Sequence, residues 1–235
     1  MKVEVLYPEL ANLYGDHFNI KYLAQCDASI KVIHTPFNEV PHFVKNKVKM
    51  IYLGPMSEQN QELIIAKLRP YQNQIKKLID DGVIFLATGN ALEVFGDYII
   101  DGERKIKGLG IFKSYAIRDF EHRHNSLFLG TYNDLNLVGY KSQFSTSFNN
   151  DQPFIKVTRG LGLNEGDSHE GINQNNFFGT YLLGPILVLN PYFTKHLLGL
   201  LGAPTTLAFE SAIMAAYETR LKEYTDPNVK FMASH

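Results

Sequence analysis

The chain is poor in cysteine, in net charge and in long apolar runs. Its single cysteine, Cys26, excludes an intramolecular disulfide. A net charge of −1 provides no field that would attract nucleic acid or an anionic lipid surface, so neither is an expected partner. No apolar run approaches the roughly 20 residues that span a bilayer, and no apolar secretory core follows the N-terminal MKVEVLYPEL. Together these absences predict a cytoplasmic protein.

The histidines do not form a metal-binding pattern. His122 and His124 flank Arg123 in a polar turn, and no other Cys or His lies at a spacing that would complete a set of zinc ligands. We therefore expect neither a metal nor any other cofactor.

Apolar residues make up 45% of the 235 residues, which is enough to bury a sizeable core without a disulfide or a metal. As far as Gly96, short apolar runs alternate with longer amphipathic stretches, a pattern typical of βαβ units. Helices are expected over about 17–26 and 57–80, with Ser57 as N-cap. The expected strands are Val3–Tyr7, Ile30–Ile33, Met50–Leu53 and Val83–Ala87.

Val83–Ala87 is the most apolar of these strands, and its composition predicts burial on both faces at the centre of a parallel sheet. After Gly96 the chain holds short β-like runs and frequent turn residues, and two helices follow. These runs are 110–115, 126–132, 137–140 and 177–182, and the helices are 191–201 and 206–223. The pattern predicts one α/β domain over 1–235, with a mostly parallel sheet flanked by helices and an antiparallel second half.

The turn after this central strand is the first place to look for a site, because ligands of open α/β sheets lie at the carboxyl ends of the strands. Residues 87–96 read as strand, sharp turn and helix, the elbow on which hydrolases present a nucleophile. Its tip would be Gly89, which accepts a positive φ but has no side chain. A glycine that serves only a tight turn would give the same pattern.

Several short motifs occur in order along the chain. They are NLYGD at 12–16, VFG at 94–96, GLGI at 108–111, GLGLN at 160–164, EGI at 170–172 and GTYLLGPIL at 179–187. This series resembles the glutaminase subunit of lipid II isoglutaminyl synthase, within the cobyric-acid-synthase-like class I glutamine amidotransferases. The resemblance extends from residue 1 to about 190 and implies the class I glutamine amidotransferase-like fold.

The resemblance also implies where the catalytic residues should stand. The nucleophilic cysteine of the family falls on Gly89 when the elbow is counted back from Gly96, and its general-base histidine falls on Leu183. Amide hydrolysis by this route needs a thiolate and a group that transfers protons, and neither glycine nor leucine provides one. We therefore expect a glutaminase-dead relative with no catalytic residue.

The residues that would bind substrate follow from the same resemblance. The substrate arginine of the family matches Arg123, which could clamp a carboxylate bidentately or lie on the surface. Asn90 belongs to the elbow, and Glu93 stands where the family has glutamine. Gly54 opens the expected oxyanion loop, in which Pro55 removes one N–H donor. A further stretch, 139–144, resembles a His-Gly-Gly segment of the family.

Three residues could replace the missing groups, and each has a structural interpretation as well. Thr88 adjoins the elbow, but a threonine at a strand end is expected to cap the next helix. Cys26 reads as a small core residue of the first helix. His169 lies in a polar segment and is expected in a solvated loop, although it is the best candidate for a replacement base.

By resemblance, the partner would be a Mur-ligase-like ATP-dependent synthetase that acts on the peptidoglycan stem peptide. Our hypothesis is a subunit that binds or regulates this synthetase without hydrolysing glutamine. Two alternatives remain open. One is a working amidotransferase with an unusual site, and the other is a stand-alone sensor of glutamine or another amino acid.

Overall fold

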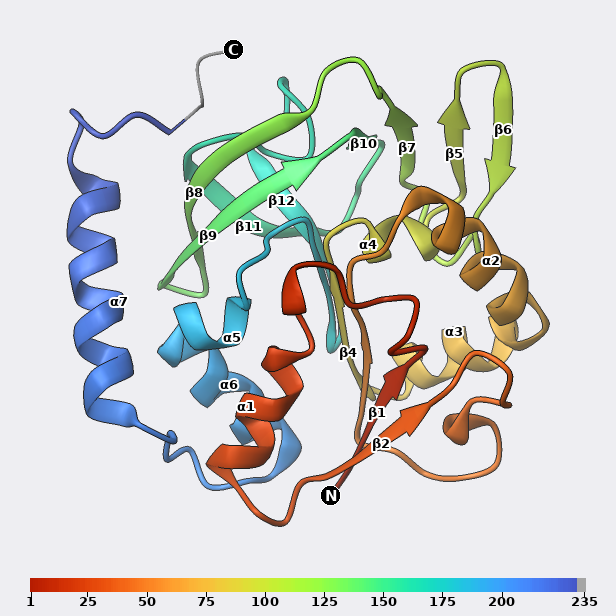
Figure 1. Ribbon diagram of the computed structural model, residues 1–235, viewed down its shortest axis with the longest axis horizontal. Coiled ribbons are helices and arrows are strands. Elements are labelled where there is room, and N and C mark those ends of the chain that lie inside the picture. Colours follow the sequence, from red (N-terminus) through yellow and green to blue (C-terminus); the bar gives the residue numbers. More distant parts are fainter. Residues whose placement is uncertain (232–235) are drawn as a thin grey trace.

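The computed structural model describes residues 1–231, so the last residues of the predicted domain, 232–235, lie outside the described range. Within residues 1–231 the strands form one nine-stranded and one four-stranded sheet. Helices cover both faces of the parallel part of the larger sheet (Figure 1). Within residues 1–231, no helix is long and apolar enough to cross a membrane.

The large sheet has a parallel half and an antiparallel half, as predicted. Its parallel strands, in spatial order, are β2 (Lys31–Thr35), β1 (Lys2–Leu6), β3 (Met50–Leu53), β4 (Ile84–Thr88) and β13 (Phe177–Thr180). The antiparallel strands β12 (His169–Gln174), β11 (Pro153–Arg159), β8 (His124–Tyr132) and β9 (Leu135–Gln143) continue it. Every residue of β4 is buried between β3 and β13, which confirms the predicted central strand.

The strands feed two cores because successive side chains point to opposite faces of a sheet. Ile51 and Phe85 belong to one core, and Tyr52 and Leu86 belong to the other. The first face is covered by α2 (Glu58–Leu68) and α3 (Gln72–Asp80), the second by α1 (Phe18–Cys26), α5 (Ile186–Leu189) and α6 (Pro191–Leu201).

The prediction of one helix over 57–80 is wrong. The chain forms α2 and α3, which a 3-10 turn at Arg69–Tyr71 separates. Pro70 accounts for the break, since proline has no N–H to donate and its ring crowds the preceding turn. The predicted N-cap is confirmed, because Ser57 Oγ accepts a hydrogen bond of 3.2 Å from the N–H of Asn60.

The small sheet is formed by four strands between residues 98 and 148, in the spatial order β10 (Ser145–Phe148), β7 (Tyr115–Arg118), β5 (Tyr98–Asp101) and β6 (Arg104–Lys107). The β-like run predicted at 110–115 is instead a loop as far as Tyr115. Its N–H groups bond to the last residues of the elbow segment 87–96. Gly110 N donates to Gly96 O at 2.7 Å, and Ile111 N donates to Phe95 O at 3.0 Å. The loop therefore supports the elbow rather than pairing as a strand.

A C-terminal arm, residues 210–231, packs against the antiparallel end of the large sheet. It begins with α7 (Glu210–Thr225), four residues later than predicted at 206, and α7 lies beside β8 and β9 (Figure 1). Tyr217, Tyr224 and Phe231 form a small apolar core with strand residues. Arg159 fixes the end of the arm by donating hydrogen bonds to its carbonyl groups.

Candidate functional site

The elbow has the predicted geometry. β4 ends at Thr88, Gly89 has a φ of 59°, and the short helix α4 (Ala91–Val94) begins after Asn90. A φ in this range is unfavourable for any residue with a Cβ, which explains the glycine at the tip.

Gly89 and Leu183 face each other, as the register derived from the sequence requires. A Cβ placed on Gly89 would lie 3.3 Å from Cδ2 of Leu183. The main chain holds Leu183 in this position, because its N–H donates to the carbonyl oxygen of Tyr140 at 2.9 Å and forms an isolated bridge to β9. The two positions therefore meet at one point, although 94 residues separate them in the sequence.

Pro55 closes the point at which a side chain at position 89 would stand. A Cβ on Gly89 would lie only 2.6 Å from Cβ of Pro55, a distance that real Cβ atoms essentially never show. Because the clash is with a rigid proline ring, the loop would have to move before residue 89 could carry a side chain. The position of the expected nucleophile is therefore filled by a neighbour.

Asn90 ties down the loop that faces the elbow. Its Oδ1 accepts a 3.1 Å hydrogen bond from the N–H of Met56, and its Nδ2 donates to the carbonyl oxygen of Met56 at 2.8 Å. An oxyanion hole needs main-chain N–H groups that are available to the reacting oxygen. In this loop Pro55 has no N–H and that of Met56 is already used.

A pocket of about 130 Å³ opens beside these contacts. Ligand pockets for drug-sized molecules have about 300–1,000 Å³, so the elbow pocket is small. Of the predicted binding residues, Arg123 and Asn90 line it, whereas Gly54 and Glu93 are buried and do not line it. Its other lining residues are Leu13, Tyr14, Pro55, Met56, Ser57, Glu58, Gly89, Ser142, Gln143, Phe144, Ser145 and Leu183.

Arg123 lies at the mouth of this pocket and is solvent-exposed. Its Nη2 donates a hydrogen bond to the hydroxyl of Tyr14, and its guanidinium lies 5.0 Å from the ring centroid of Phe144. Tyr14 has a φ of 60°, which is uncommon for an aromatic residue. The arginine therefore contacts two aromatic side chains from motifs that the sequence marked, although no sequence pattern indicated that they meet it.

Glu93 anchors the elbow from inside the protein. One carboxylate oxygen accepts hydrogen bonds from Ser145 Oγ and, at 2.8 Å, from Tyr181 Oη, and the other accepts from Gln61 Nε2 at 2.9 Å. Burial raises the pKa of Glu93, and these hydrogen bonds oppose that effect. With three side-chain donors around it, this carboxylate is satisfied by the protein itself.

Thr88 is not the helix cap that we expected. Its Oγ1 points into the core and donates to Oδ2 of Asp16 at 2.5 Å, and the same oxygen accepts from Tyr52 Oη at 2.6 Å and from Asn19 Nδ2 at 3.0 Å. Burial raises the pKa of Asp16. NLYGD marked this aspartate in the sequence, but its contact with Thr88 crosses 72 residues and only the fold shows it.

The remaining candidates lie away from the elbow pocket. Cys26 ends α1, is half-buried, and accepts a hydrogen bond from Ala208 N at 3.4 Å, and burial raises its pKa. His169 is not in a solvated loop: it is the first residue of β12 and is partly buried. Within residues 1–231, no group of three or more His, Cys, Asp or Glu side chains is placed to hold a metal ion.

The parallel sheet, the glycine elbow at the end of its central strand and the facing loop define a glutamine amidotransferase-type fold. Residues 2–190 match the CobB/CobQ-like glutamine amidotransferase domain, and the chain belongs to this family.

Two relatives are similar to the chain over most of their own length. It is 29% identical over 190 residues to the lipid II isoglutaminyl synthase (glutamine-hydrolyzing) subunit GatD of Staphylococcus aureus (strain N315), covering 80% of this chain and 78% of the relative. It is 28% identical over 208 residues to the subunit of the same name from Streptococcus pneumoniae (strain ATCC BAA-255 / R6), covering 81% and 76%. A crystal structure of a glutamine amidotransferase superimposes with a TM-score of 0.58 at 13% identity, over 85% of this chain and 99% of that one, which shows the shared fold.

Proposed function

We propose that this chain is a glutaminase-dead, amidotransferase-like subunit that binds or regulates a Mur-ligase-like, ATP-dependent synthetase. Its two GatD relatives are subunits of lipid II isoglutaminyl synthase, which supports a role in modifying the peptidoglycan stem peptide. Such a complex would act in the cytoplasm, where ATP is available.

The observation that carries this proposal is the contact between Pro55 and Gly89. A missing cysteine alone would leave a gap that a small substitution could fill. Here the gap is closed, because a Cβ on Gly89 would lie 2.6 Å from Pro55 and 3.3 Å from Leu183. Neither the nucleophile nor the base of thiolate-driven amide hydrolysis has a counterpart at these positions.

The facing loop supports the same conclusion. Removing one oxyanion-hole donor lowers kcat by about 10²–10³ in a well-studied hydrolase. In this chain Pro55 lacks an N–H, and that of Met56 is bonded to Asn90 at 3.1 Å. The chain therefore lacks the nucleophile and also has fewer N–H groups available for an oxyanion, as we expect for a subunit that does not hydrolyse glutamine.

Two measurements test the proposal. The purified chain, alone and co-expressed with the Mur-ligase-like synthetase of its own organism, is incubated with glutamine, and ammonia is measured against a GatD relative as positive control. We expect no ammonia above the blank and a stable complex in size-exclusion chromatography. Steady ammonia release would refute the loss of activity. Failure to form a complex would instead favour the stand-alone sensor.

One observation favours a working amidotransferase as the second candidate. Ser145 lines the elbow pocket, and its Oγ donates to the buried carboxylate of Glu93, an arrangement in which a carboxylate could accept a proton from a serine nucleophile. Tyr181 and Gln61 already bond to the same carboxylate, which argues against a free base. Any ammonia release that Ser145→Ala abolishes would establish this alternative.

A further inference from the structure

A cleft of about 810 Å³ lies at the edge of the large sheet where β1, β3 and β4 begin. The loop 43–49 and the end of α3 complete its walls. Main-chain hydrogen bonds join these segments, since Lys49 N donates to Lys2 O at 2.9 Å and Ile84 N donates to Lys49 O at 3.1 Å. The elbow follows the opposite, carboxyl end of β4 (Figure 1), so the cleft is separate from the site described above.

Basic side chains dominate the polar surface of this cleft. Four exposed lysines line it, namely Lys2, Lys45, Lys47 and Lys49. None of the four forms an ion pair within residues 1–231. Among the described residues, the only acidic side chain that lines the cleft is Asp81, and its Oδ2 already lies 2.7 Å from Lys77 Nζ. The cleft therefore has an excess of positive charge, although the whole chain has a net charge of −1.

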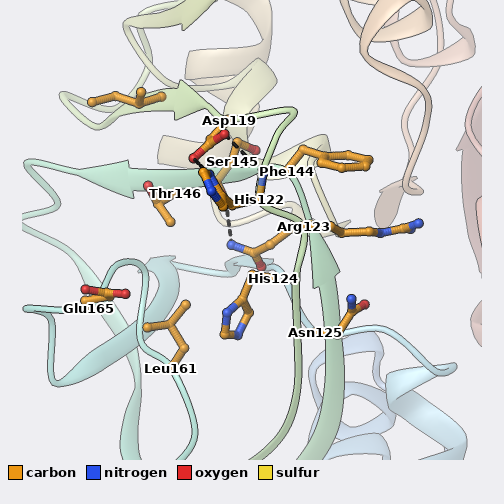
Figure 2. A pocket seen from close by; sticks show the side chains of 12 residues that line it. Asp119, His122, Arg123, His124, Asn125, Phe144, Ser145, Thr146, Leu161 and Glu165 are labelled. Carbon is orange, nitrogen blue, oxygen red and sulfur yellow. Dashed lines mark hydrogen bonds and ion pairs between the residues drawn. The ribbon is translucent and has the colours of Figure 1, made fainter. Parts of the chain in front are cut away.

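The cavity beside the elbow pocket, drawn in Figure 2, shows the opposite arrangement. Asp119 and Glu165 line it together with His122 and Arg123, and His122 Nδ1 lies 2.9 Å from Asp119 Oδ2. Acidic and basic side chains thus accompany each other in that cavity. In the cleft the cations have no such counterpart, and like charges held close together repel one another. The lysines therefore indicate an anion that comes from outside the chain.

Apolar side chains give the cleft a second kind of surface. Val44, Leu78 and Val83 are half-buried, and Leu200 is 38% exposed. In the described part of the chain, the only aromatic residue that lines the cleft is Phe43, which is 2% exposed. No ring face is therefore open for a nucleobase to stack on. These walls suit an aliphatic group.

We propose that this cleft binds an organic phosphate with an aliphatic body. The phosphate lies among the lysines, whose flexible stems and rotatable donors suit it, and the aliphatic body packs on Val44, Leu78 and Val83. Because several cations line one cleft, a dianionic phosphate should bind more tightly than a carboxylate. The volume falls in the range of about 300–1,000 Å³ that is usual for ligand pockets. A soluble phosphate ester and the headgroup of an anionic lipid both have this chemistry.

The first experiment uses ligands that differ in charge or in the aliphatic group. Inorganic phosphate, hexyl phosphate and hexanoate are titrated into the full chain by isothermal titration calorimetry at low salt. We expect hexyl phosphate to bind at least about tenfold more tightly than the other two, because it alone combines a dianion with an aliphatic group. Added salt should weaken this binding, since the lysines are exposed.

A flotation assay distinguishes the two sources of the phosphate. The chain is mixed with vesicles of phosphatidylcholine alone or of phosphatidylcholine with phosphatidic acid. Binding to the mixed vesicles only would identify a lipid headgroup as the ligand. Binding of hexyl phosphate without binding to either kind of vesicle would identify a soluble ester.

Two sets of variants test the walls. Lys45→Gln with Lys47→Gln should weaken hexyl phosphate binding at least about tenfold without lowering the melting temperature, because both side chains are exposed. Lys21→Gln with Lys156→Gln is the matched control, since these exposed lysines lie outside the cleft, and it should change neither. Leu200→Gln should weaken the binding of hexyl phosphate but not that of inorganic phosphate.

The proposal is overturned by any of three results. One is that neither hexyl phosphate nor the mixed vesicles bind at about millimolar concentration. Another is equal weakening by the cleft pair and by the control pair, which would show that only the overall charge attracts the anion. The third is hexyl phosphate that binds no more tightly than inorganic phosphate, which would mean that the apolar wall contacts no ligand.

Discussion

Gly89 and Gly102 have the same φ of +59° but different surroundings, and this pair isolates the effect of Pro55. A Cβ on Gly102 would have nothing within 4 Å, whereas one on Gly89 would meet Pro55 at 2.6 Å and Leu183 at 3.3 Å. Alanine at either position should cost about 1–2 kcal/mol, because the left-handed conformation is unfavourable for a residue with a Cβ. At Gly89 the overlap should add about 1–3 kcal/mol, the usual penalty for overpacking.

The measurement is urea unfolding of the wild type and of both alanine variants. We expect Gly102→Ala to lower the free energy of unfolding by about 1–2 kcal/mol and Gly89→Ala by about 2–5 kcal/mol. In a Pro55→Gly background the excess at Gly89 should disappear, because the clashing Cβ is gone. The coupling energy of this double-mutant cycle then measures the contact directly.

Equal losses for Gly89→Ala and Gly102→Ala would refute the reasoning, since Pro55 would then not fill the space beside residue 89. The same holds if the excess at Gly89 persists in the Pro55→Gly background. The result also decides how restoration should be attempted. Gly89→Cys with Leu183→His is expected to give a thiol that alkylates rapidly near neutral pH only when Pro55 is also replaced by glycine.

Three further predictions concern other parts of the fold. Burial lowers the pKa of Lys141 to about 8, whereas the pKa of an unfolded lysine is about 10.4. The folded chain therefore loses this proton at a lower pH than the unfolded chain, so the free energy of unfolding should rise between about pH 8 and about pH 10. Urea unfolding at both pH values measures the rise. Lys141→Met should remove it, and the exposed control Lys113→Met should not. Arg159→Ala should release the end of the C-terminal arm, because three carbonyl groups lose a charged donor. We expect faster limited proteolysis near 226–230 and a free energy of unfolding that is lower by about 1.5–3 kcal/mol. Asn90→Ala should free the N–H of Met56, and hydrogen exchange at that amide should become faster. The free energy of unfolding should fall by about 1–3 kcal/mol.

The parallel half of the fold could be predicted from the sequence because its elements carry their own signals. β3 matched its apolar run, Met50–Leu53, and α6 matched Pro191–Leu201, where proline opens the helix. β5, β6 and β7 were missed as strands. β6, for example, is RKIK with three exposed positions, and its pairing with β5 rather than any apolar alternation makes it a strand.

The site shows the same division. The glycine at the tip of the elbow follows from a local pattern, and its facing residue, Leu183, follows from the family register. The closing of the elbow by Pro55 and the hydrogen bond from Thr88 to Asp16 are contacts across long sequence separations. Periodicity and spacing carry no information on such long-range contacts. The sequence could therefore indicate that residues 89 and 183 meet, but not that Pro55 fills the space beside them.

The bridge between Leu183 and Tyr140 has a consequence for related proteins. It joins two main chains, so position 183 stays where it is whichever side chain it carries. Chains with this fold can thus lose or regain chemistry at that point while their backbone trace stays the same. Shape alone will not separate working enzymes from silent ones in such a lineage. The residues at positions 55, 89 and 183 are therefore the ones to compare between this chain and its relatives.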